Sequence, residues 1–326
     1  MGQGTNIAWC DDTWNPWRGC TKVSAGCANC YAEKLVTGRM QGQPYRKGIP
    51  RVRHATWTFN APLGWNKNPW ICDACGQAYK TDGVTPSGDL CFNHRGVWPP
   101  RHRRRVFSLS LGDWLDDEVP IGWLADMLDV VRRCPELDFL LLTKRPALWR
   151  DRLTGVMNYS ACGETASWLS WWLDTSGDAI APGNIWLGVS VEDQATVDER
   201  IPQLLEIPAA VRFVSYEPAL GAVSFQQSAF SHPEKQIDWM IVGGESGSMA
   251  RPFNVAWARY SIKQCEAAGA ACFVKQLGSA PIVDREDAQI IRDRKGGDPA
   301  EWPEDLRVWQ WPVSARRADA TNTVRP

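Results

Sequence analysis

The chain has 326 residues, 44% of them hydrophobic and 22% charged, so it can bury a large core as one big domain or as a domain with insertions. The formal net charge of −1 excludes a global attraction to nucleic acid, so such a contact must come from local clusters. Eleven cysteines, without a secretory signal or an apolar run long enough to cross a bilayer, indicate a reducing compartment. We therefore expect a cytoplasmic protein whose thiols bind metal.

The first motif is a loop of three cysteines, Cys20, Cys27 and Cys30, spaced C-x6-C-x2-C. A short β-like run at Ile7–Trp9 precedes it, and apolar residues at helical spacing follow it over 31–40. Three thiolates leave a tetrahedral metal or an iron–sulfur cubane one ligand short. The trio therefore favours a [4Fe–4S] cluster with one open position over a structural zinc site, which normally has four ligands. Three unrelated thiols, or a zinc site completed from elsewhere, are the alternatives.

A second metal motif lies in residues 61–105, which are rich in Gly, Pro and Trp. Its spacing is C-x2-C-x15-C-x2-H, formed by Cys72, Cys75, Cys91 and His94. This closed set of four ligands predicts a structural zinc ribbon in a small insertion, with a second iron–sulfur cluster as the alternative. The run 101–105 that follows contains four arginines and one histidine, and it fits either a phosphate-contacting patch or a solvated surface.

From Val106 onward, continuous apolar runs alternate with helical patterns. Strands are expected at 106–110, 138–142, 184–192, 211–218, 239–245 and 271–276, and helices at 123–131 and 255–267. This alternation predicts an α/β fold with a parallel sheet covered on both faces. A Trp-rich segment at 154–183 is expected to be a second insertion, whose tryptophans pack in the core more readily than they stack on bases.

Polar residues follow the apolar runs of the predicted strands. Each one alone fits an ordinary cap or loop residue. However, a barrel or part-barrel gathers its site at the carboxyl ends of its strands, and the recurrence of these residues in every unit favours such a site. They are Asp113, Lys144, Ser190, Glu192, Glu217, Glu245 and Lys275.

Several motifs together resemble a phage-associated, radical-S-adenosylmethionine-like family of otherwise unknown function. The resemblance covers nearly the whole chain outside the two insertions. It rests on Thr5-Asn6-Ile7 with Trp9, Thr13-Trp14-Asn15-Pro16, Gly19-Cys20-Thr21-Lys22-Val23-Ser24, Gly26-Cys27, Asn29-Cys30-Tyr31-Ala32-Glu33, Leu142-Thr143-Lys144-Arg145-Pro146, Gly188-Val189-Ser190-Val191-Glu192, Gly243-Gly244-Glu245-Ser246, Lys275-Gln276 and Trp302-Pro303-Glu304-Asp305-Leu306.

The resemblance implies a radical S-adenosylmethionine enzyme on a partial (β/α) barrel, with Cys20, Cys27 and Cys30 holding a [4Fe–4S] cluster. In that superfamily the cofactor's amino and carboxylate groups chelate the open iron, and one electron cleaves the sulfonium to a 5′-deoxyadenosyl radical. By position, Ser110 and Asp113 would meet the methionine amino group, and Ser190 and Glu192 would meet the ribose hydroxyls or the carboxylate. The cofactor or substrate side would be lined by Lys144, Glu217, Glu245 and Lys275.

The expected organisation is a cluster-bearing N-terminal part of the barrel at 1–60, the zinc-binding insertion at 61–105, the rest of the barrel at 106–280 and a C-terminal extension at 281–326. Three functions are open: a radical enzyme that modifies or repairs a nucleotide or nucleic acid, a radical enzyme acting on a peptide or small metabolite, and an iron–sulfur and zinc nucleic-acid-binding protein without radical catalysis. Expected partners are S-adenosylmethionine and an electron donor such as flavodoxin or ferredoxin. If the chain is phage-encoded, we expect it in the host cytoplasm, away from membranes.

Overall fold

The structure is a computed structural model that describes residues 5–73, 76, 78–79, 101–159, 163–177, 179–225, 235–283 and 291–312. The chain divides into two compact units. The first comprises Met1–Cys20, Arg46–Leu141 and Leu148–Ile185, and the second comprises Thr21–Tyr45, Leu142–Ala147 and Trp186–Pro326. Cys20 is therefore the last residue of its segment in the first unit.

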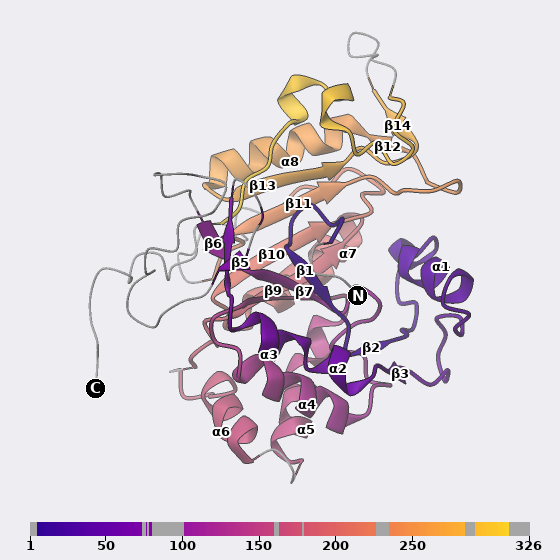
Figure 1. Ribbon diagram of the computed structural model, residues 1–326. Helices are drawn as coiled ribbons and strands as arrows, with labels where there is room; N and C mark the ends of the chain where they lie inside the picture. Colours follow the sequence, from indigo (N-terminus) through magenta and orange to yellow (C-terminus); the bar gives the residue numbers. More distant parts are fainter. Residues whose placement is uncertain are drawn as a thin grey trace. The chain divides into compact units, whose positions relative to one another are not determined.

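The first unit contains parallel strands and a group of helices. Strand β7 (Arg105–Ser108) pairs in parallel with β1 (Asp12–Trp14) and with β8 (Asp138–Thr143). Helices α4 (Ile121–Arg132), α5 (Trp149–Met157) and α6 (Gly163–Trp172) pack against one another (Figure 1). The packing arises because apolar residues at helical spacing give α4 a buried face.

Smaller elements complete the first unit. An antiparallel sheet has the order β5 (Ala78–Tyr79), β4 (Trp70–Cys72), β6 (Arg101–Arg103), and β2 (Trp17–Arg18) pairs with β3 (Val52–Arg53). Two short helices, α2 (Thr56–Phe59) and α3 (Ala61–Trp65), lie between β3 and β4 in the chain. The described part of the predicted insertion thus contains antiparallel strands, and its boundaries stay a prediction.

The second unit is built on four parallel strands. Their order is β9 (Ile185–Val191), β10 (Val211–Tyr216), β11 (Trp239–Gly243), β13 (Ala271–Gln276). Every residue of β9, β10 and β11 is buried, as expected for parallel strands with both faces covered. Helix α7 (Gln194–Leu205) packs on β10, and α8 (Val255–Ala268) packs on β11 and β13 (Figure 1).

The remaining elements of the second unit are short. Helix α1 (Tyr31–Gly38) follows the cysteines, and β12 (Phe253–Asn254) pairs with β14 (Pro281–Ile282). The 3-10 turns are η1 (Ala25–Cys27), η5 (Pro299–Glu301) and η6 (Glu304–Leu306), whereas η2 (Pro146–Leu148) spans the boundary between the two units in the chain.

The predicted α/β class is confirmed, and the main sheet has seven strands. The helix expected over 31–40 is also present, as Tyr31–Gly38. The strand expected at Ile7–Trp9 is wrong, because the first strand is β1 at Asp12–Trp14. A carboxylate, Asp12, occupies a buried position in that strand because Arg104 pairs with it at 2.7 Å. Among the described residues, no helix combines the length and hydrophobicity needed to cross a bilayer.

Glycine is required in the middle of β9. A Cβ atom at Gly188 would lie 2.4 Å from the buried ring of Phe213 on β10. We expect Gly188→Ala to lower the free energy of unfolding by about 1–3 kcal/mol, because the core must shift to accept the methyl group. Urea unfolding is the measurement, and Gly221→Ala is the control, because a Cβ there meets no atom within 4 Å. Equal midpoints for the two variants would contradict the packing argument.

Candidate functional site

The cysteine loop, residues 24–30, belongs to the second unit and leads directly into α1. Its turn is closed by the amide of Cys27, which donates to the Ser24 carbonyl at 3.0 Å, and the amide of Cys30 donates to the Cys27 carbonyl at 3.4 Å. Cys27 and Cys30 are half-buried, and neither forms a disulfide. Burial raises the pKa of the Cys30 thiol. The backbone amides of Glu33 and Ala32 oppose this shift through hydrogen bonds, whereas the neighbouring Cys27 adds to it. One short turn therefore presents two thiols.

Glu192, at the carboxyl end of β9, is fully buried and holds this loop. Its Oε1 accepts from the Gly26 amide at 3.2 Å. Lys144 and Arg200 lie 3.3 Å and 3.2 Å from its Oε2. Burial alone would raise the pKa of Glu192, but the Lys144 charge, a hydrogen bond from Ser24, the Arg200 charge and the Gly26 amide outweigh it and lower the pKa. The carboxylate is therefore kept ionised by the groups that it binds.

The helix that follows Glu192 fixes its position. Asp193 and Thr196 form a reciprocal capping box at the start of α7, and the Thr196 hydroxyl also accepts from the Glu192 amide at 3.0 Å. One turn later, Arg200 donates to the Ser190 carbonyl at 2.7 Å and reaches Glu192. The Arg200 side chain can reach back to residues that precede α7, because helical side chains point toward the helix N-terminus.

Glu245, after β11, holds the other side of the same loop. Arg251 forms a fork with it, with Nη2 at 2.7 Å from Oε1 and Nε at 3.1 Å from Oε2. The Asn29 side-chain amide donates to Glu245 at 3.0 Å, and Arg251 Nη1 donates to the Ala25 carbonyl at 2.9 Å. Burial would raise the pKa of Glu245, but the Arg251 and Asn29 hydrogen bonds lower it to about 2. The cysteine loop is thus tied to two strand ends.

The other strand-end residues of the second unit are linked by a series of polar contacts. Lys144 donates to the Ser190 hydroxyl at 2.5 Å, and Ser190 donates to the Glu217 carbonyl at 3.3 Å. Lys275, at the end of β13, lies 2.8 Å from the Glu217 carboxylate. The side chains of Lys144 and Lys275 are 20% and 25% exposed. The structure therefore brings together Lys144, Ser190, Glu192, Glu217 and Lys275, and their contact with a cofactor or substrate stays a prediction.

Cys20 lies in the first unit beside a buried arginine. A Cβ atom on the preceding residue, Gly19, would lie 2.9 Å from Cδ of Arg51, and Gly19 has φ +110°, which favours glycine. Arg51 makes two hydrogen bonds to Asp116, at 2.7 Å and 3.1 Å. Burial would lower the pKa of Arg51, but Asp116 and Glu118 raise it, and Cys20 contributes in the same direction.

Ser110 and Asp113 also belong to the first unit. The Asn15 side-chain amide donates to the Ser110 hydroxyl at 3.0 Å, and the Leu111 amide donates back to the Asn15 carbonyl oxygen at 2.9 Å. Buried Asp113 accepts from the Leu115 amide at 3.0 Å, a local turn contact. These contacts organise the end of β7. The predicted contact of both residues with a cofactor amino group stays a prediction.

Three residues of the arginine run, Arg103, Arg104 and Arg105, form neither a phosphate-contacting patch nor a solvated surface. Arg103 pairs with Asp138 at 3.2 Å, Arg104 with Asp12 at 2.7 Å and Arg105 with Asp11 at 3.3 Å. Arg104 and Arg105 are buried, and Arg104 lies over the Trp65 ring. Both sequence-based interpretations of these residues were wrong, because carboxylates distant in the sequence neutralise them inside the first unit.

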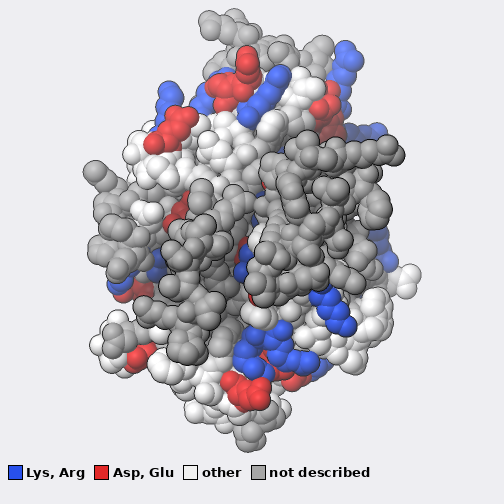
Figure 2. All heavy atoms as spheres, turned by 60° about the vertical axis from the view of Figure 1, so that its left-hand side comes forward, with Lys and Arg blue, Asp and Glu red and all other residues white. Residues whose placement is uncertain are grey.

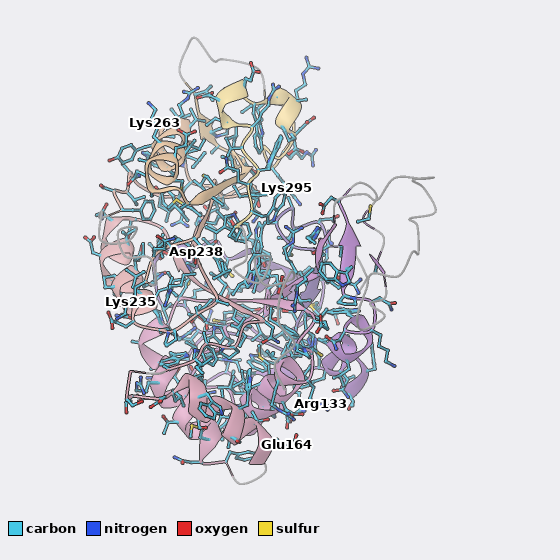
Figure 3. The ribbon with its side chains drawn as sticks, turned by 90° about the vertical axis from the view of Figure 1, so that its left-hand side faces the viewer. Arg133, Glu164, Lys235, Asp238, Lys263 and Lys295 are labelled. Atoms are coloured by element: carbon cyan, nitrogen blue, oxygen red, sulfur yellow. The ribbon has the colours of Figure 1, made fainter. Side chains whose placement is uncertain are left out.

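In Figure 2, described Lys and Arg side chains are intermixed with Asp and Glu on the face that is drawn. Exposed Lys235, Lys263 and Lys295 of the second unit are widely separated in Figure 3, and Lys235 pairs with Glu206 at 3.2 Å. A groove for long nucleic acid would need a continuous basic track, which these three side chains do not provide.

The predicted zinc ligands are mostly outside the described residues. Cys72 is buried at the end of β4, whereas Cys75, Cys91 and His94 lie outside the described residues. In the described part of the chain, no group of three or more His, Cys, Asp or Glu side chains lies close enough to hold a metal ion. Both metal sites therefore stay predictions.

Sequence analysis assigned no role to four residues that lie near the cysteines or bind the carboxylates that anchor the loop: Asn29, Arg51, Arg200 and Arg251. Of these four, only Asn29 could have been found from the sequence, because it lies between Cys27 and Cys30 in the cysteine motif. The three arginines are single residues in segments without a motif. Only the fold brings Arg251 to Ala25, which is 226 positions away in the chain.

The Glu245 contacts predict an acid-dependent stability. The ordinary pKa of 4.5 is lowered to about 2 in the folded protein, so the ionised group stabilises the fold above pH 4.5, and this contribution is lost as the pH falls toward 2. We expect the difference in urea midpoint between wild type and Glu245→Gln to be constant above pH 5 and to shrink in that window. A difference that persists unchanged at pH 2 would contradict the assignment.

Residues 4–303 match the model of a family described as "Protein of unknown function (DUF5131)". Neither the curated proteins nor the solved structures gave a match. The family description states no activity, so a function must be argued from the residues themselves.

Proposed function

We propose that this chain, which belongs to the DUF5131 family of proteins of unknown function, is a radical S-adenosylmethionine enzyme with a partial (β/α) barrel. In this proposal Cys20, Cys27 and Cys30 hold a [4Fe–4S] cluster. The observation that carries it is the cysteine loop itself: two half-buried thiols on one turn, held in place by the strand-end carboxylates Glu192 and Glu245.

The chemistry of these residues suits such a cluster. Thiolates are the ligands that iron–sulfur clusters take, and three of them leave one position open. Thiolate ligands accumulate negative charge, and the chain places a guanidinium near two of them: Arg51 against Gly19, next to Cys20, and Arg251 on the Ala25 carbonyl, two residues before Cys27. Cys20 directly precedes Thr21, the first residue of the second unit, in the chain.

When bound, the cluster and S-adenosylmethionine would supply a reductively generated radical able to abstract hydrogen from an unactivated C–H bond. The chain would hold and orient these groups. Glu192 and Glu245 fix the loop, and Lys144, Ser190, Glu217 and Lys275 offer polar contacts at neighbouring strand ends. Glu192, Glu217 and Glu245 follow strands β9, β10 and β11, whose residues are all buried, and a buried surrounding would help to exclude water from the reacting groups.

The substrate that we propose is a nucleotide, or a nucleic acid engaged over a short length. The side chains of Lys144 and Lys275 are 20% and 25% exposed, and each would share its charge between the carboxylate that it pairs with and an anionic group such as a phosphate. The internal pairing of Arg103, Arg104 and Arg105 removes the feature that favoured a long nucleic-acid track. A peptide or small metabolite is the second candidate, and the intermixed surface charge favours it.

The cluster proposal is tested by purifying the protein without oxygen and reconstituting it with iron and sulfide. We expect about four iron and four sulfide per chain and, after reduction with dithionite, the electron paramagnetic resonance signal of a reduced [4Fe–4S] cluster. Cys134→Ala is the matched control, because Cys134 is a buried cysteine whose thiol pKa is raised by burial to about 12. Wild-type protein that takes up no more iron than a variant lacking Cys20, Cys27 and Cys30 would refute the proposal.

A further inference from the structure

Arg251 stands between a strand-end carboxylate and the cysteine loop. Three of its nitrogen atoms are used: two bind Glu245, and Nη1 donates to the Ala25 carbonyl at 2.9 Å. Its own amide also donates to Glu245 at 3.0 Å. Glu245 in turn binds Asn29, which lies between Cys27 and Cys30. The pair therefore grips the loop on both sides of Cys27.

Glu192 provides a second anchor at Gly26, which lies between Ala25 and Asn29 in the chain. The Gly26 amide donates to Glu192, and a Cβ atom at Gly26 would lie 3.1 Å from the Glu192 carboxylate carbon. The loop is thus held at three points: the Ala25 carbonyl by Arg251, the Gly26 amide by Glu192 and the Asn29 side chain by Glu245. The carboxylates of Glu192 and Glu245 accept hydrogen bonds from the loop, whereas their positions in the sequence predicted contact with a cofactor.

We infer that Arg251 is a positioning residue, which holds the cysteine loop in its metal-binding conformation through Glu245 and sets the reduction potential of the centre that the loop carries. The metal centre in this statement rests on the proposed function, whereas the loop anchoring rests on the contacts alone. Arg251 is suited to both tasks, because its planar fork binds the carboxylate bidentately while the remaining nitrogen reaches the loop.

The electrostatic consequence has a definite sign. A guanidinium near Cys27 stabilises negative charge there, and reduction of a thiolate-ligated centre adds negative charge. The Arg251 side chain is 30% exposed and Glu245 is 7% exposed, so solvent screens part of this effect. Removing the charge at position 251 should therefore lower the reduction potential, and keeping it as lysine should retain most of the wild-type value.

The first test needs no metal. The metal-free full-length protein is treated with iodoacetamide for a series of times, and labelling is measured by mass spectrometry after trypsin digestion. Cleavage gives the peptide Val23–Lys34, with Cys27 and Cys30, and the peptide Gly19–Lys22, with Cys20. We expect Arg251→Gln and Glu245→Gln to label Val23–Lys34 about five- to tenfold faster than wild type, because lost hydrogen bonds favour local opening.

Two controls make that test specific. Arg259→Gln removes an arginine of the same unit that pairs with Asp305 on the surface, and it should leave labelling unchanged. The Cys20 peptide serves as the internal reference, and far-UV circular dichroism identifies any variant that fails to fold. Labelling of Val23–Lys34 at the wild-type rate in both folded variants would overturn the positioning role.

The second test uses the reconstituted protein and a potentiometric titration followed by electron paramagnetic resonance. Arg251→Gln should have a lower midpoint potential than wild type, and Arg251→Lys should recover most of the difference; a merely structural role would not produce this recovery. Equal potentials for wild type and Arg251→Gln would overturn the electrostatic role. If wild type binds no cluster, the proposed function fails, and the labelling experiment alone decides whether Arg251 positions the loop.

Discussion

Asp116→Ala is expected to lower the free energy of unfolding of the first unit by about 3–5 kcal/mol, because it leaves the Arg51 guanidinium buried without its main partner. The side chains of Arg51 and Asp116 are 1% and 0% exposed, and two hydrogen bonds join them. Other contacts of Arg51, such as those with Glu118 at 3.3 Å and the Ile49 carbonyl at 2.6 Å, do not replace a bidentate carboxylate. Urea unfolding followed by circular dichroism measures the loss.

A matched ion pair on the surface of the same unit provides the control. Arg53 and Asp126 lie 2.7 Å apart, but their side chains are 37% and 50% exposed. Asp126→Ala should therefore cost at most about 1 kcal/mol. Arg51 lies close to Gly19, since a Cβ atom there would be 2.9 Å from its Cδ, so Asp116→Ala should also weaken the iron binding that we propose for Cys20. A loss in Asp116→Ala no larger than that in Asp126→Ala would contradict the role of burial.

Metal analysis of two cysteine variants is expected to separate two independent metal sites. In Cys27→Ala we expect nearly all cluster iron to be lost and zinc to be retained, because the predicted zinc site has its own four ligands. In Cys75→Ala we expect the reverse, loss of the single zinc ion with the iron retained. The measurement is inductively coupled plasma mass spectrometry on protein purified without oxygen.

The separation follows from the ligand sets, Cys20, Cys27 and Cys30 against Cys72, Cys75, Cys91 and His94. Cys265→Ala is a suitable control, because this cysteine of α8 is buried with its thiol against Met240 of β11. Simultaneous loss of both metals in folded Cys27→Ala would show that the sites depend on one another. Retention of iron in that variant would remove Cys27 from the ligand set.

The backbone of the second unit was predictable because its signals are local. Apolar runs at 184–192, 211–218 and 239–245 became buried parallel strands within a few residues of the predicted bounds. The position of polar residues after the strands was also visible in the sequence. The first strand was misplaced, because its buried carboxylate, Asp12, depends on Arg104 from a distant segment.

The partners of the strand-end residues could not be predicted, because they come from distant parts of the chain. Glu192 meets Gly26 across 166 positions, and Glu245 meets Asn29 across 216. A single sequence contains no signal for such pairs. The arginine run shows the same limit, since its composition suggested a surface feature whereas its carboxylate partners make Arg104 and Arg105 internal.

The most direct measurement of the central claim is the formation of 5′-deoxyadenosine from S-adenosylmethionine. Reconstituted protein is incubated with dithionite and S-adenosylmethionine without oxygen, and the product is quantified by liquid chromatography and mass spectrometry. The proposal predicts 5′-deoxyadenosine with wild type and with Cys134→Ala, and none with the variant lacking Cys20, Cys27 and Cys30. Wild-type protein that carries a full, reducible cluster and still forms no 5′-deoxyadenosine would contradict the radical mechanism.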